Sequence, residues 1–159
     1  VIAYLGWYKH YEVYAEAAAD EEISSVIENV KSIVSSVIAK EYEITFEEQL
    51  AFTQRAINKF KNKEIFDTIY RNARQAKRKL GENERLLSPL KFAQKYDSDT
   101  TYFDLIIAAA SLYAVKEESE NIEMLWVELN AGEDIDLIKK AYNALENGCS
   151  ITSTLKELA

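Results

Sequence analysis

Residues that break helices are scarce in this sequence. Its 159 residues include one proline, Pro89, and four glycines. Because both residue types interrupt helices, their scarcity favours helix along most of the chain. The glycines, at positions 6, 81, 132 and 148, lie too far apart to form GxGxxG or a glycine-rich phosphate loop. The chain therefore contains no recognisable nucleotide-binding motif.

Cysteine and histidine each occur once, as Cys149 and His10. A single cysteine excludes an internal disulfide and fits a reducing compartment, so we expect a cytoplasmic protein. One cysteine and one histidine cannot fill a Cys/His zinc site, and we expect no metal. No base is evident near Cys149 in the sequence, and His10 lies beside tyrosines that are typical packing residues. We therefore predict that neither residue is catalytic.

Long apolar runs and a surplus of positive charge are also lacking. No apolar stretch approaches the roughly 18 residues needed to span a bilayer, and the formal net charge is -8. Since nucleic acids and anionic membranes attract an excess of positive charge, we expect neither as a partner. The composition, 48% hydrophobic and 29% charged, is typical of a globular protein. We expect a single domain over residues 1–159.

Apolar periodicity and capping residues predict helices along the whole chain. Eight apolar residues between Ile23 and Ile38 recur at steps of three and four, which places them on one helix face. Thr45 and Glu48 form a capping box, and Gly132 and Gly148 are typical left-handed helix stops. The predicted helices are 1–8, 20–38, 45–60, 64–72, 88–96, 100–113, 119–131, 134–147 and 152–159, with an irregular basic stretch before residue 81. The sequence therefore predicts an all-α, multi-helix bundle.

Positive charge is concentrated in residues 55–85, which hold ten Lys and Arg against four acids, while the rest of the chain holds nine against 23. Arg71, Arg74 and Arg78 would share one face of a continuous helix, and a bend would bring Lys79 to the same place. Arginine and lysine in such a group match the oxygens of a phosphate or carboxylate. These four residues are candidate anion ligands. The alternative is that they pair with acids of neighbouring helices and hold the helices in register.

Several stretches together resemble one family. They are AYLG at 3–6, RNARQAKRKL at 71–80, NERLLSPL at 83–90 and the alanine-rich IIAAASLY at 106–113. The family pattern between the first and last of them is RFxNPxxxDxxxRVxRxPxRKLxxxDRLxxP. In this order and spacing the chain resembles, over nearly its whole length, the C-terminal domain of the mannitol-1-phosphate 5-dehydrogenases, within the polyol-specific long-chain dehydrogenase family.

The resemblance implies the substrate-binding domain of an NAD-dependent enzyme that interconverts mannitol 1-phosphate and fructose 6-phosphate without a metal. It implies that Arg71 and Lys79 bind the polyol substrate, and that Arg74 and Arg78 help with its phosphate. In the family a catalytic lysine, an asparagine and a histidine precede AYLG, and a Rossmann domain before them binds NAD. These 159 residues hold none of these parts, so we expect a fragment that is inactive alone.

The chain departs from the family pattern at two prolines. Lys63 and Ala76 stand in their places, so the turns that orient the basic side chains are less constrained. Two other interpretations stay open. One alternative is a related hexuronate or polyol dehydrogenase, in which the basic cluster binds a carboxylate. The other is a non-catalytic helical interaction module, whose anion-binding basic patch docks an acidic partner.

Overall fold

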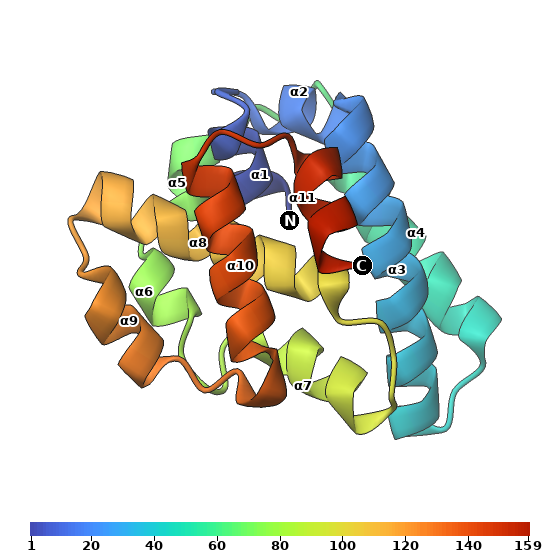
Figure 1. Cartoon of the computed structure of the whole chain (residues 1–159). Helices are drawn as coiled ribbons and strands as arrows, with labels where there is room; N and C mark the ends of the chain where they lie inside the picture. The colour runs from blue at the N-terminus through green and yellow to red at the C-terminus, as the bar shows by residue number, and fades with distance from the viewer.

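The computed structural model describes all 159 residues, and it contains eleven α-helices, one 3-10 helix and no strand (Figure 1). In chain order the helices are α1 (Ile2–Tyr8), α2 (Tyr14–Ala19), α3 (Glu21–Tyr42), α4 (Phe46–Phe60), α5 (Ile69–Ala73), α6 (Ala76–Lys79), α7 (Leu87–Lys95), α8 (Thr101–Glu118), α9 (Ile122–Glu128), η1 (Gly132–Asp134), α10 (Ile135–Glu146) and α11 (Ile151–Leu158). The predicted all-α class is confirmed. None of the helices combines the length and the apolar character needed to cross a membrane.

α8 is the central helix of the fold. Every residue from Phe103 to Ala114 is buried, so this helix is covered on all sides. α1, α6, α7, α10 and α11 pack against it, and α10 crosses one of its faces (Figure 1). A helix that is apolar around its whole circumference is stable only inside a protein, which accounts for the run IIAAASLY in its middle.

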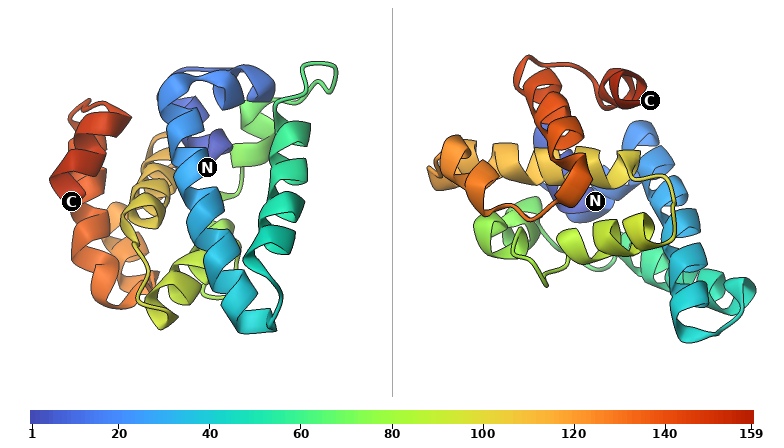
Figure 2. Two further views of the ribbon diagram at one scale, coloured as in Figure 1. Left: turned by 90° about the vertical axis from the view of Figure 1, so that its right-hand side faces the viewer. Right: turned by 60° about the horizontal axis from the view of Figure 1, so that its bottom comes forward.

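α3 and α4 form a helical hairpin at one side of the molecule. α3 begins after Asp20, whose carboxylate accepts a hydrogen bond from the Ile23 amide at 3.1 Å. α4 begins at the predicted capping box, where the Glu48 amide donates to Thr45 Oγ1 at 3.2 Å and the Thr45 amide donates to Glu48 Oε2 at 3.1 Å. Both predicted helix starts are confirmed. The two helices lie side by side (Figure 2, left), but α4 buries only Ile57.

The basic stretch between α4 and α7 differs from its prediction in two respects. The helix expected over residues 64–72 begins only at Ile69, because Thr68 caps it by accepting the Arg71 amide at 3.2 Å. The part expected to be irregular contains α6, a single helical turn. Between α5 and α6 the chain bends at Gln75, which adopts a left-handed φ of 62°. The bend separates the basic residues into two short helices.

The structure differs from the prediction at three other places. The prediction misses α2 altogether. The helix expected over residues 119–131 is shorter at both ends: Ser119 ends α8 with a left-handed φ of 56°, and Asn121 caps α9 by accepting the Met124 amide at 3.0 Å. Gly132 has the expected left-handed conformation, with a φ of 64°, but it opens η1 instead of ending a helix. Gly148, with a φ of 82°, follows α10 as predicted.

Candidate functional site

The four candidate anion ligands lie on and around the bend between α5 and α6. Two long-range contacts fix this bend from opposite sides. Tyr4 of α1 donates its hydroxyl hydrogen to the Ala73 carbonyl at 3.0 Å. Glu118, at the end of α8, accepts the Ala76 amide at 2.9 Å and also accepts the Gln75 amide. Ala73 and Ala76 are fully buried, so the bend is pressed closely against the central helices.

Lys79 is the buried member of the group, with a relative exposure of 7%. Its ammonium donates a hydrogen bond to the Asn72 carbonyl and forms no ion pair within 4 Å. Burial, together with repulsion from Arg85 and Arg78, lowers the pKa of Lys79, while the Glu118 carboxylate acts in the opposite direction. A buried ammonium whose nearest charges are mostly positive is an unusual arrangement, and Glu118 is the one carboxylate that acts on it.

The three arginines are arranged unequally around Lys79. Arg78 donates from Nε to Gln75 Oε1 at 3.1 Å, and its Nη1 lies 3.8 Å from Glu84 Oε1. Arg74 is exposed and forms no ion pair. Arg71 is at the rim: its side chain is 69% exposed, and its Nε lies 3.1 Å from Asp67 Oδ1. Arg71 and Arg78 thus pair with acids of the same basic segment and not with acids of neighbouring helices, while Arg74 and Lys79 form no ion pair.

One further basic residue belongs to this cluster. Arg85 follows the turn after α6, is exposed, and its charge contributes to the lowered pKa of Lys79. Reasoning from helical spacing misses Arg85, because it assumes one continuous helix and Arg85 lies beyond Gly81. The charge count of residues 55–85, which does not depend on helix geometry, includes it.

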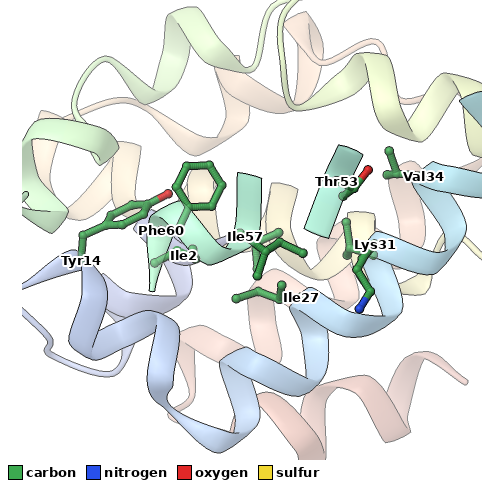
Figure 3. Close-up of a pocket in the computed structure, with 10 residues that line it drawn as sticks. Ile2, Tyr14, Ile27, Lys31, Val34, Thr53, Ile57 and Phe60 are labelled. Carbon is green, nitrogen blue, oxygen red and sulfur yellow. The ribbon is translucent and has the colours of Figure 1, made fainter. Parts of the chain in front are cut away.

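The beginning of α1 lies beside the same cluster. Val1 stands at the start of α1 and packs against the hydrophobic core. Val1 and Arg85 line one small crevice of about 80 Å³. Val1 also lies at an apolar groove of about 190 Å³ between α3 and α4, lined by side chains such as Ile27, Ile57 and Phe60 (Figure 3). Val1, the residue before α1, thus lies between the crevice at Arg85 and this apolar groove.

The largest cavity, of about 520 Å³, lies elsewhere, and both His10 and Cys149 line it. Its polar side chains are bonded to one another. The Lys9 ammonium lies 2.7 Å from Asp20 Oδ2 and 2.8 Å from Glu22 Oε2. The charges at this cavity are therefore balanced within the chain, in contrast to those around Lys79.

Comparison with known proteins agrees with the resemblance. The sequence model of the mannitol dehydrogenase C-terminal domain matches residues 1–148. A mannitol-1-phosphate 5-dehydrogenase of Caldanaerobacter subterraneus is 28% identical over 143 residues, which is 90% of this chain and 36% of that protein. The mannitol-1-phosphate 5-dehydrogenase of Geobacillus stearothermophilus is 31% identical over 134 residues, 78% of this chain and 33% of that protein. The chain spans about a third of the length of the curated relatives that it matches.

Proposed function

Because the chain belongs to the mannitol dehydrogenase C-terminal domain family, we propose that it is the substrate-binding part of a cytoplasmic, NAD-dependent mannitol-1-phosphate 5-dehydrogenase. Its residues bind the phosphate end of mannitol 1-phosphate and of fructose 6-phosphate, the two sides of a reversible hydride transfer. NAD accepts or returns the hydride, and it is bound by a Rossmann domain that precedes this chain. No metal takes part in the proposed reaction.

One observation carries the proposal: Lys79 is buried without an ion pair, among arginines that cannot lose their charge. A phosphate would bring the missing negative charge, and its oxygens would accept hydrogen bonds from ammonium and guanidinium donors. Arg74 and Arg78 lie beside Lys79 and add to the attraction. Arg71 lies at the rim and contacts the substrate once its guanidinium leaves Asp67.

The position of Val1 supports a role for the residues that precede it in the family. There the resemblance places a lysine as the general base, with an asparagine and a histidine that orient the reacting oxygen. Since Val1 lines the same crevice as Arg85, side chains in the turns that precede Val1 would reach the basic cluster. The base would remove the proton of the substrate hydroxyl while the hydride leaves the carbon. The basic cluster would hold the substrate in position for this transfer.

The test is steady-state kinetics on a full-length enzyme that contains this chain. We expect Lys79→Ala to lower kcat/KM by some 30- to several-thousand-fold, the range expected when a buried charged partner is lost. Arg71→Ala should lower kcat/KM less, because Arg71 is at the rim. The 159-residue chain alone should show no turnover. Near-normal kcat/KM for both variants, with a lowered melting temperature, would show that the cluster is structural.

The same assay separates the proposed substrate from its alternatives. A phosphate site should favour mannitol 1-phosphate over mannitol, and this preference should disappear in Lys79→Ala. Higher kcat/KM for a hexuronate than for the phosphate ester would assign the cluster to a carboxylate. No turnover of any polyol by the full-length enzyme would support the interaction module.

A further inference from the structure

We propose that the apolar groove between α3 and α4 is the docking site of the segment that directly precedes Val1, and that this segment enters the groove as a continuation of α1. The inference rests on the function proposed above, which places the greater part of the enzyme before Val1. It goes beyond that function because it says where the preceding segment packs. One helical face covers the groove, and the opposite face stays free for the substrate site.

Two openings of the surface meet at Val1. The apolar groove, of about 190 Å³, has Val30 and Val34 of α3 on one wall and Ile57 of α4 on the other (Figure 3). The crevice of about 80 Å³ shares Val1, Val30 and Val34 with the groove and continues to Phe103 of α8. The N-terminus lies beside α3, on the side that faces α4 (Figure 2, left). A segment that precedes Val1 therefore leaves the folded core at the groove itself.

The apolar face of α3 is incompletely covered at the groove. Val26 and Val37 are each 1% exposed, whereas Val30 and Val34, which lie between them on the same face, are only partly buried. α4 supplies little cover here, because Ile57 is its one buried residue. An apolar surface that is open in the middle of an otherwise buried helix face is typical of a place that another segment covers.

The first turn of α1 indicates how that segment continues. No side chain caps this helix, and Leu5 is the first residue whose amide bonds along it, donating to the Val1 carbonyl at 3.2 Å. Ile2, Ala3 and Tyr4 are all buried. The amides of a buried first turn need acceptors, and the carbonyls four residues earlier supply them when the helix continues. α1 therefore extends backwards through Val1 towards the groove.

The size and the lining of the groove determine which part of the segment enters it. An apolar cavity of roughly 150 Å³ holds a molecule of the size of benzene, so the groove takes about one or two side chains and not a whole helix. The polar side chains of Lys31 and Thr53 have partners of their own, at 2.9 Å from Gln54 Oε1 and 3.0 Å from the Gln49 carbonyl oxygen. The groove thus favours an apolar helix face.

The experiment measures the reactivity of a thiol placed in the groove. Cys149, and any cysteine before Val1, is replaced by serine, and Val34→Cys then supplies the only thiol. Three forms carry it: the 159-residue chain, this chain extended by its own preceding three helical turns, about 11 residues, and the full-length enzyme. An aromatic disulfide reagent should react readily with the 159-residue chain and at least about tenfold more slowly with both longer forms, because it reaches the thiol there only through local opening.

Two further cysteines check this result. Thr53→Cys, on the α4 wall of the groove, should be protected by the same extension, and it replaces Val34→Cys if that variant lowers the melting temperature. Val127→Cys is the control. Val127 is 87% exposed on α9, which lies on the other side of the molecule from α3 and α4 (Figure 1). Its thiol should react at the same rate in all three forms, and a thermal melt shows that each form is folded.

Protection by the 11-residue extension alone supports the inference. Three other results would overturn it. Protection only in the full-length enzyme would assign the groove to another part of that enzyme. Protection of the 159-residue chain that grows with its concentration would assign the groove to a second copy, and equal reactivity in all three forms would mean that nothing covers it.

The proposed function is judged separately, by turnover of the full-length enzyme. An enzyme that oxidises mannitol 1-phosphate while its groove thiol stays reactive would keep the proposed function and refute the docking site. Protection of the thiol without turnover of any polyol would contradict the proposed function and leave the docking site standing.

Discussion

Each end of α8 lies beside a group of like charges, but the two groups differ in how their charges are neutralised. At the N-terminal end, Asp104 is fully buried, and Asp134 is nearly so. At the C-terminal end, Glu118 holds the bend that buries Lys79 among arginines. The first group consists of acids that can take up a proton, and the second includes guanidiniums that cannot lose one.

The acidic end neutralises itself. The Thr100 hydroxyl oxygen lies 3.4 Å from Asp104 Oδ2 and 3.3 Å from Asp134 Oδ1. A hydroxyl has one hydrogen, so it can donate to only one of these carboxyl groups at a time. Burial, with repulsion from Asp134 and Asp99, raises the pKa of Asp104 to about 8, and the Thr100 hydroxyl opposes the rise. Asp104 is therefore neutral at pH 7. The neighbouring Asp134 accepts a hydrogen bond at Oδ2 from Gln94 Nε2, at 2.8 Å.

The basic end has no such solution. Arginine stays charged at every accessible pH, and burial lowers the pKa of Lys79 without supplying an opposite charge. Asp67 and Glu84 pair with two of the arginines, but no carboxylate forms an ion pair with Lys79. The comparison teaches that a group of like charges does not by itself mark a binding site. What distinguishes the Lys79 end is that its buried cation has no ion-pair partner in the chain.

The largest expected effect is at the acidic end. The pKa of Asp104 rises from the ordinary aspartate value of 3.8 to about 8 on folding, so the unfolded chain releases this proton at lower pH than the folded chain does. Stability from this group is fully present below about pH 4 and is lost as the pH rises towards 8, by at most about 6 kcal/mol. Asp104→Asn, which stays neutral, should therefore become more stable than the unsubstituted chain as the pH rises. Urea unfolding at pH 5 and pH 8.5 measures this difference.

The control for this prediction is Asp99→Asn. Asp99 is exposed, and its Oδ1 accepts the Thr101 amide at 3.0 Å. An asparagine keeps that acceptor and removes only the smallest contribution to the raised pKa of Asp104, so its stability curve should nearly parallel that of the unsubstituted chain. Curves of equal shape for Asp104→Asn and the unsubstituted chain would mean that Asp104 is ionised in the folded state.

The next effect is at the basic end, where Glu118 holds the bend. Glu118→Ala leaves the buried Ala76 amide without an acceptor and should lower the free energy of unfolding by about 1 to 3 kcal/mol. Phosphate binding should weaken as well, because α6 carries Lys79. Glu118→Gln keeps one side-chain oxygen and should lose less stability. If Glu118→Ala bound phosphate normally, the bend would not be what positions Lys79.

Glu118 also marks the limit of what the sequence could predict. Local signals gave α3, the capping box of Thr45 and Glu48, and the left-handed Gly148, because each depends on residues within one or two turns. The division between α5 and α6 depends on a carboxylate 42 residues further along the chain and on a left-handed Gln75. No local pattern signals either feature. For the same reason spacing could group the basic residues but could not predict that Lys79 is buried and Arg71 exposed.

A smaller effect tests whether the unbalanced charge at Lys79 lowers stability. Lys79→Met keeps the apolar stem and removes the buried ammonium, so the free energy of unfolding should stay equal or rise by about 1 kcal/mol. Phosphate binding should fall at the same time. Lys77→Met is the control on the same helix: its ammonium lies 3.4 Å from Glu120 and 3.6 Å from Glu128, and it should affect binding little. A clear loss of stability in Lys79→Met would show that the Lys79 ammonium stabilises the fold.

The smallest effect concerns the rim of the site, where Arg71 is the one arginine with a close acidic partner. Asp67 Oδ1 accepts the Thr68 amide at 2.8 Å and lies 3.1 Å from Arg71 Nε. Asp67→Asn keeps an oxygen for the Thr68 amide but removes the negative charge, so Arg71 is released while the helix start is preserved. Phosphate affinity of the chain should then rise, by only about two- to threefold, because Arg71 is exposed and its field is screened by salt. The gain should disappear in Asp67→Asn combined with Arg71→Ala, and it should shrink when the salt concentration is raised. An unchanged affinity in a phosphate titration of Asp67→Asn would place Arg71 outside the site.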